Sequence, residues 1–191
     1  MGFRIEDGKG RGRFAAVDHE NRLEVSAVTL PLAADRAHEG NAFSIMGEHT
    51  LQASATEENV LHFQNGNADK HVHFFSTVLA VETSNTMTVR KYFSATRTSG
   101  GTSKIPVQLN RGSAAESGVV AYDNSSNNLV LGTTSQVQYC TTRFGSTFTR
   151  QLSHADSIIL GPGDTFHVTV EGNSGAKITA TIFIYESGEV G

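Results

Sequence analysis

The residues best suited to chemistry are His71 and His73, which stand two apart in an apolar run. On a β-strand, residues i and i+2 point to the same face, so two imidazoles could share one metal ion. A third ligand would have to come from a later strand, and His167 is the candidate. This spacing makes His71 and His73 the first metal site to consider.

The wider pattern does not favour a metal. Cupin-type jelly-roll metalloenzymes place a glycine before His-x-His, and Gly66 precedes His71 here, but they also carry an acidic ligand that three or four residues separate from the second histidine. Those positions are Thr77 and Val78, and the first acid is Glu82. We therefore expect partly exposed strand histidines, no bound metal and no cofactor.

Further catalytic signatures are also missing from the sequence. No Gly-x-Ser-x-Gly elbow occurs, and Glu57 and Glu58 are adjacent in a predicted loop, which is not the facing geometry of a glycosidase. The single Cys140 permits no internal disulfide, and a small buried thiol is its expected role. We predict that the protein is not an enzyme.

Length and composition indicate one β-rich core. The chain has 191 residues, 38% of them apolar and 18% charged, with 11 Phe and no Trp. β-Branched and ring side chains favour pleated sheets, and this size suits one large domain. No run is long enough to span a membrane and the first residues lack a secretory core, so we expect no membrane contact and assembly in the cytoplasm.

Charge is unevenly distributed along the chain. The net charge of −4 divides into −5 for residues 1–82, +5 for residues 83–155 and −4 for residues 156–191. Blocks of opposite sign suit contact between copies of a chain, unless strand order mixes them in space. The isoelectric point of about 6.0 argues against nucleic acid as a partner.

The first forty residues differ from the rest. Residues 1–13 are rich in glycine and charge, which predicts an extended arm. Residues 14–17 and 22–28 are predicted to form a β-hairpin around a turn at 18–21, so that arm and hairpin together span residues 1–30. Residues 31–40 are expected to be a linker or a short helix.

Residues 41–191 are predicted to form the body, an antiparallel β-sandwich or jelly roll. Strands are expected at 60–64, 71–82, 86–93, 105–109, 136–142, 146–151, 157–160, 165–172 and 177–186. Pro106 cannot donate to a ladder, so its strand should lie at an edge. Residues 110–134 should form a long connection with one or two short strands, and Gly161–Asp164 a type II turn.

The opening of the chain resembles that of a known family. Ile5-Glu6-Asp7-Gly8-Lys9-Gly10, followed by Ala16-Val17-Asp18-His19-Glu20-Asn21-Arg22-Leu23-Glu24-Val25-Ser26-Ala27-Val28-Thr29, resembles the start of virion structural proteins of tailed bacteriophages. Weaker matches are Phe63 to Asn67, Asn110 to Ser113 and Leu160 to Asp164. The resemblance implies a β-sandwich body behind the opening.

The resemblance also implies a role. We expect a non-enzymatic virion component, foremost a capsid decoration (cement) protein that binds the major capsid protein, and we expect a homotrimer. A neck, tail or fibre-base protein is the alternative within the virion. Two functions outside a virion stay open: a cupin-like metal-binding jelly roll on His71 and His73, and a sandwich that binds glycans through Tyr92, Tyr122 or Phe144.

The predicted partner contacts lie in the arm and hairpin. Four basic residues should touch acidic groups of a neighbouring subunit: Arg4, Lys9, Arg11 and Arg13. Arg22, Glu24 and the strand through Val28 should hold the arm to the body, or to a partner by strand addition.

Overall fold

The computed structural model describes residues 16–17, 23–24, 36–82, 87–132, 137–144 and 148–188. The chain divides into two compact units, Met1–Pro31 and Leu32–Gly191. In the first unit, β1 (Ala16–Val17) pairs antiparallel with β2 (Leu23–Glu24), within the predicted hairpin. The predicted arm, residues 1–13, lies outside the described residues.

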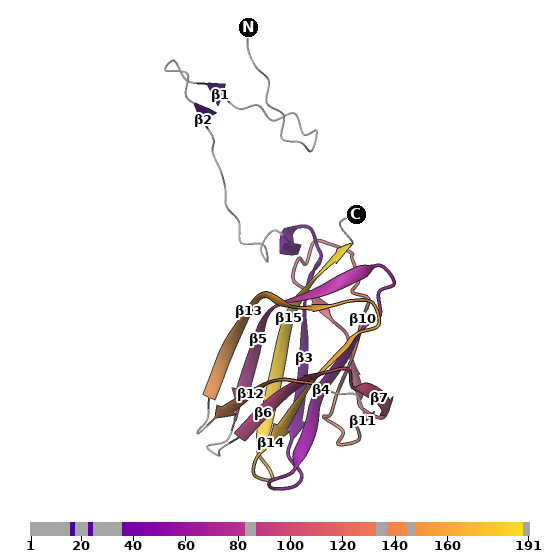
Figure 1. The fold of residues 1–191 in the computed structure, drawn as a ribbon, viewed down its shortest axis with the longest axis vertical. Helices are drawn as coiled ribbons and strands as arrows, with labels where there is room; N and C mark the ends of the chain where they lie inside the picture. Colours follow the sequence, from indigo (N-terminus) through magenta and orange to yellow (C-terminus); the bar gives the residue numbers. More distant parts are fainter. Residues whose placement is uncertain are drawn as a thin grey trace. The chain divides into compact units, whose positions relative to one another are not determined.

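The second unit is built almost entirely of β-strands (Figure 1), after a short helical turn at residues 36–38. One sheet has six strands, in the order β12 (Val137–Phe144), β6 (Met87–Phe93), β14 (Thr165–Glu171), β4 (Glu57–Asn65), β10 (Val119–Asp123) and β8 (Thr102–Lys104). The other has five, in the order β13 (Phe148–Leu160), β5 (Lys70–Val81), β15 (Lys177–Gly188), β3 (Ala42–Thr50) and β9 (Val107–Gln108). A small sheet pairs β7 (Thr96–Ser99) with β11 (Val130–Gly132).

The order of the eight principal strands is that of a jelly roll. In chain order these strands are β3, β4, β5, β6, β12, β13, β14 and β15, and the first lies beside the last, the second beside the seventh, the third beside the sixth and the fourth beside the fifth. All of these pairs are antiparallel. A folded-over ribbon wrapped into two sheets gives this pattern. The predicted antiparallel β-sandwich is confirmed.

Alternating side chains explain why the two sheets pack together. Along β15, Ile178, Ala180, Ile182 and Ile184 are fully buried, while the residues between them face outward. Between the sheets, the rings of Phe63, Phe74 and Phe166 meet with centroids 4.9 to 5.4 Å apart. Burying each such side chain contributes about 1.5–3 kcal/mol, so this apolar layer is the main source of stability.

Residues 94–132 form an insertion between β6 and β12. The insertion contributes β8 and β10 to one side of the six-stranded sheet and β9 to the edge of the five-stranded sheet. Its remaining strands, β7 and β11, form the small sheet. In the described part of residues 110–134, β10 and β11 match the one or two short strands predicted. The strands β7 and β8 were not predicted, because their polar, glycine-containing sequence lacks a clear alternating pattern of apolar residues.

Several local predictions can be compared with the strands. The segment with Pro106 lies at a sheet edge, as predicted, since β9 pairs only with β3. The Gly161–Asp164 turn has Gly163 at φ 82° and a 3.1 Å bond from Asp164 N to Gly161 O, also as predicted. The two predicted strands at 146–151 and 157–160 are wrong, because β13 runs through both with an irregularity between Ser153 and Ile158.

Candidate functional site

The outward face of the six-stranded sheet carries a row of ring side chains. Tyr92, His167, His62 and Tyr122 are register partners on the neighbouring strands β6, β14, β4 and β10. The rings of Tyr92 and His167 are stacked, with centroids 4.9 Å apart. Tyr92, His167 and His62 are only 6%, 1% and 3% exposed. An outward face with such low exposure must be covered by another part of the chain.

The insertion provides that cover. The Ala95 carbonyl lies 3.0 Å from His62 Nε2, and the Arg97 guanidinium lies over the Tyr122 ring at 3.7 Å from the centroid. Asn59 Nδ2 donates to the Leu129 carbonyl at 3.1 Å, which holds the far end of the insertion to β4. The ring row is therefore a second, smaller core.

Burial changes the acid–base chemistry of this row. Desolvation lowers the pKa of His167 to about 4, and the electrostatic effect of the nearby His62 acts in the same direction. Desolvation also lowers the pKa of His62, although its bond to Ala95 opposes the change. The Nδ1 atoms of both rings have no hydrogen-bond partner. Both histidines are therefore neutral at pH 7.

Tyr92 is part of a polar cluster beside the row. Its hydroxyl donates to Glu57 Oε1 at 2.7 Å, and Arg90 binds Glu57 at 3.1 Å and Glu171 at 2.8 Å. Desolvation, with the bond to Glu57, raises the pKa of Tyr92 to about 12. Glu57 and Glu58 begin β4 rather than lying in a loop as predicted, and their carboxylates serve two separate structural clusters.

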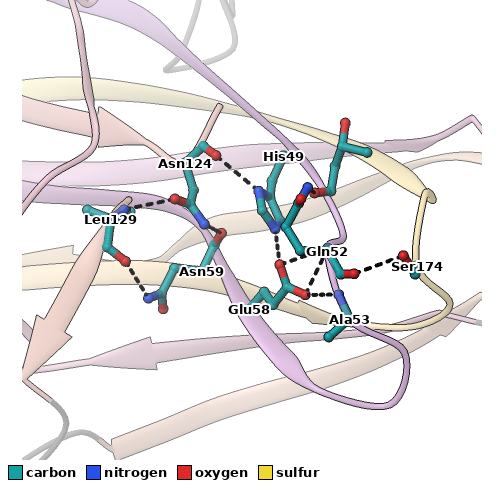
Figure 2. Close-up of polar contacts among 9 residues, drawn as sticks. His49, Gln52, Ala53, Glu58, Asn59, Asn124, Leu129 and Ser174 are labelled. Atoms are coloured by element: carbon teal, nitrogen blue, oxygen red, sulfur yellow. Dashed lines mark hydrogen bonds and ion pairs between the residues drawn. The ribbon is translucent and has the colours of Figure 1, made fainter. Parts of the chain in front are cut away.

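The second cluster is a buried polar clamp around His49 (Figure 2). His49 Nε2 lies 2.6 Å from Glu58 Oε2, and His49 Nδ1 lies 3.0 Å from the Asn124 carbonyl. Both ring nitrogens face oxygen atoms, so the ring bridges the Glu58 carboxylate and the Asn124 carbonyl. Asn124 in turn donates to the Asn59 carbonyl and accepts from Leu129 N. The clamp therefore fastens the insertion to β3 and β4.

Glu58 also receives backbone bonds in the clamp. The amides of Ala53 and Gln52 donate to Glu58 Oε1 at 2.8 Å and 3.0 Å, which closes the loop between β3 and β4 (Figure 2). Burial opposes the charge, but the bonds from Ala53, His49 and Gln52 outweigh it and lower the pKa of Glu58. This carboxylate is a structural anion and not a free acid–base group.

The outward face of the five-stranded sheet differs because its apolar side chains reach solvent. We call this surface the open face. Its members point away from the core on β3, β5, β9, β13 and β15: Ser44, Met46, Phe75, Val78, Val107, Ile159, Thr181 and Phe183. Met46 and Val107 are each 55% exposed and Ile159 is 51% exposed.

The open face combines apolar side chains with charged groups at one end. The rings of Phe75 and Phe183 lie 5.7 Å apart and are half-buried near its centre. Beyond β9, Ile105 is 85% exposed and extends the apolar surface past the sheet edge. Charge gathers at one end, where Lys177 binds Glu48 at 3.2 Å. An apolar patch with a charged rim is typical of a surface that another protein covers.

The predicted partner residues are not tested by the structure. Arg4, Lys9, Arg11, Arg13 and Arg22 lie outside the described residues, and Glu24 is described only as part of β2.

The two candidate metal ligands lie on one outward face, as their spacing predicts. His71 and His73 flank the buried Val72 on β5, and His73 stacks on Tyr185 with centroids 4.5 Å apart. His73 Nε2 lies 2.8 Å from Ser187 Oγ. His167 cannot be a third ligand, because it lies on the outward face of the other sheet. Among the described residues, no three His, Cys, Asp or Glu side chains are grouped to hold a metal ion.

The predicted glycan platform is not an open ring surface. Tyr92 is buried and stacks on His167, and the Arg97 guanidinium covers Tyr122. The Phe144 side chain lies outside the described part of the chain.

Neither the open face nor the burial of Lys91 was predicted from the sequence. Met46 and Val107 belong to strands that are short or preceded by polar residues, so only the finished sheet shows that they share a face with Phe183. Lys91 belongs to the basic block at 83–155 that the sequence suggests for the surface, but its side chain is fully buried. Its place between Val89 and Phe93, both inward-facing, is the alternation that could have located it.

The sequence matches no protein-family model and no curated protein. Within the described residues, no helix is long and apolar enough to cross a membrane. The fold and the open face together define the class: a jelly-roll protein with one covered and one exposed sheet face.

Because His167 is buried in its neutral form, we predict that the folded state loses stability as the pH falls. An unfolded chain protonates His167 near pH 6.5, whereas the folded chain resists protonation to about pH 4. Stability is therefore fully present above pH 6.5 and falls as the pH drops, by up to about 3 kcal/mol from His167. Urea unfolding between pH 4 and 8 should show a shallower acid decline for His167→Gln. Replacement of the exposed His38 by Gln is the control and should retain the wild-type decline; an unchanged slope in H167Q would contradict this account.

Glu58→Gln should weaken the clamp. The amide places donors where His49 and two backbone amides already donate, so the free energy of unfolding should fall by about 1–3 kcal/mol. Chemical denaturation at pH 7 measures the change. Glu116→Gln, at an exposed position, should have little effect, and equal values for the two variants would show that the clamp is not stabilising.

Proposed function

We propose that this chain is a non-enzymatic structural protein of a tailed-bacteriophage virion, and that it decorates the capsid by binding the shell of the major capsid protein. The observation that carries the proposal is the open face. A protein that leaves apolar rings and aliphatic side chains exposed on a rigid sheet is built to be covered by another protein. The resemblance of residues 5–10 and 16–29 to virion structural proteins supplies the class of partner.

The fold suits this role physically. Jelly rolls are shared by capsid proteins, lectins and cupins, so the fold alone does not select a function. The ring row and the clamp tie the insertion to the body, so that the described parts of both pack as one unit. A rigid docking unit loses little entropy on binding, and weak contacts repeated over many copies then add up to firm attachment.

The arm residues would add a second contact. The basic side chains of Arg4, Lys9, Arg11 and Arg13 complement acidic groups on a neighbouring subunit, and Arg22 with Glu24 would anchor the hairpin to the body or to a partner. A homotrimer fits this scheme, since threefold positions of a shell offer symmetry-matched sites. The protein would then be located in the virion after assembly in the host cytoplasm.

Copy number on purified virions tests the function. Quantitative mass spectrometry should find the chain at a level comparable to that of the major capsid protein. A few copies per particle would instead place it in the neck, tail or fibre base, which contradicts decoration. Absence from particles would contradict a virion role altogether.

Charged substitutions on the open face test how it attaches. Met46→Lys combined with Val107→Lys should reduce loading onto decoration-free particles at least tenfold, because it buries two amines in an apolar contact. Co-sedimentation measures loading, and circular dichroism checks folding. Val130→Lys is the matched control, since Val130 is 51% exposed outside the open face; equal loss in both variants would rule out the open face as the docking surface.

A further inference from the structure

Lys91 is the most unusual side chain in the sandwich. It lies on β6 between Val89 and Phe93, and its register partner on β14 is the core residue Val168. Its side chain is fully buried, and Nζ has no hydrogen-bond partner. An amine in an apolar core with no acceptor stabilises nothing in the fold, so its presence needs another explanation.

The neighbour of Lys91 on the other side is the single cysteine of the chain. Cys140 on β12 is the direct cross-strand partner of Lys91, at a register shift in the β12–β6 ladder. Directly opposed residues of paired strands share a face, with Cβ atoms about 4.5–5.5 Å apart. The thiol is free and half-buried, so a small solute can reach it. A lysine whose amine has no hydrogen-bond partner and a cysteine with a free thiol are thus opposed across the β12–β6 ladder, and each group affects the charge of the other.

The environment shifts the pKa values of both the Lys91 amine and the Cys140 thiol. Desolvation lowers the pKa of the Lys91 amine, against a smaller opposing effect of Cys140, and so favours the neutral, nucleophilic form. Desolvation raises the pKa of the Cys140 thiol, although Lys91 partly offsets this. The thiol therefore reacts faster as the pH rises, and the neutral amine forms at a lower pH than it does for an exposed lysine.

We propose that Lys91 Nζ and Cys140 Sγ are a redox modification site, in which hydrogen peroxide joins them through a covalent sulfenamide bond. In the first step the Cys140 sulfur attacks peroxide, an S–O bond forms, the O–O bond breaks, and sulfenic acid and water result. In the second step the Lys91 lone pair attacks Sγ, an N–S bond forms and the S–O bond breaks. The departing hydroxyl leaves with one amine proton as a second water.

Atoms and electrons balance in these two steps with hydrogen peroxide as the only added reactant. The thiol and the amine together lose two hydrogen atoms, sulfur is oxidised by two electrons, and peroxide is reduced by two electrons to two waters. A thiol reductant reverses the bond. The product ties the edge strand β12 covalently to β6, and the site does not depend on the proposed virion function.

Peptide mapping of the full-length protein tests the site. After treatment with hydrogen peroxide at pH 8, mass spectrometry should find the Lys91 and Cys140 peptides linked, with the mass of two hydrogens missing, and cleavage after Lys91 by trypsin should be lost. Dithiothreitol should release both peptides. Lys177→Met is the control and should retain the link, while Lys91→Met and Cys140→Ser should abolish it.

Two results would overturn the proposal. Peroxide could add only oxygen to Cys140 and leave the Lys91 peptide unchanged, or Cys140 could pair with Cys140 of a second copy as a disulfide. The wild-type map decides between these outcomes without any variant, so the test holds even if Lys91→Met fails to fold.

Discussion

A β-sheet has two faces, and a sandwich of two sheets buries only one face of each. In this protein the shared apolar layer, centred on Phe63, Phe74 and Phe166, satisfies the inward faces. The two outward faces differ. The insertion covers the outward face of the six-stranded sheet, whereas much of the outward face of the five-stranded sheet is exposed to solvent. This asymmetry determines which groups are structural and which are available to a partner.

Covering one face with polar strands requires partners for every buried polar group. The clamp of His49, Glu58 and Asn124 supplies them at one end of the insertion, and Ala95 and Arg97 contact the ring row. Where partners are missing on the covered face, as at Nδ1 of His62 and His167, burial keeps the imidazoles neutral at pH 7. Lys91 is a separate case, because it lies in the apolar layer between the sheets and its amine has no acceptor there.

The body could be predicted from sequence wherever alternation is strong. The strands β14 and β15 alternate Val, Phe and Ile with polar residues, and Pro106 marks an edge, so the sandwich class follows from local patterns. The position of residues 94–132 could not be predicted, because their burial depends on tertiary contacts with His62 and Tyr122. The same limitation concealed the burial of Lys91 and the exposure of Met46, since the role of each depends on strands distant in the sequence.

The central claim is that this jelly roll attaches to a protein shell through the exposed face of its five-stranded sheet. Cryo-electron microscopy of purified virions tests it most directly. The account predicts ordered density for the sandwich at repeated positions on the capsid surface, with Met46, Phe183 and Val107 turned toward the shell. Density with the six-stranded sheet and its insertion against the shell, or capsids without this density, would contradict it.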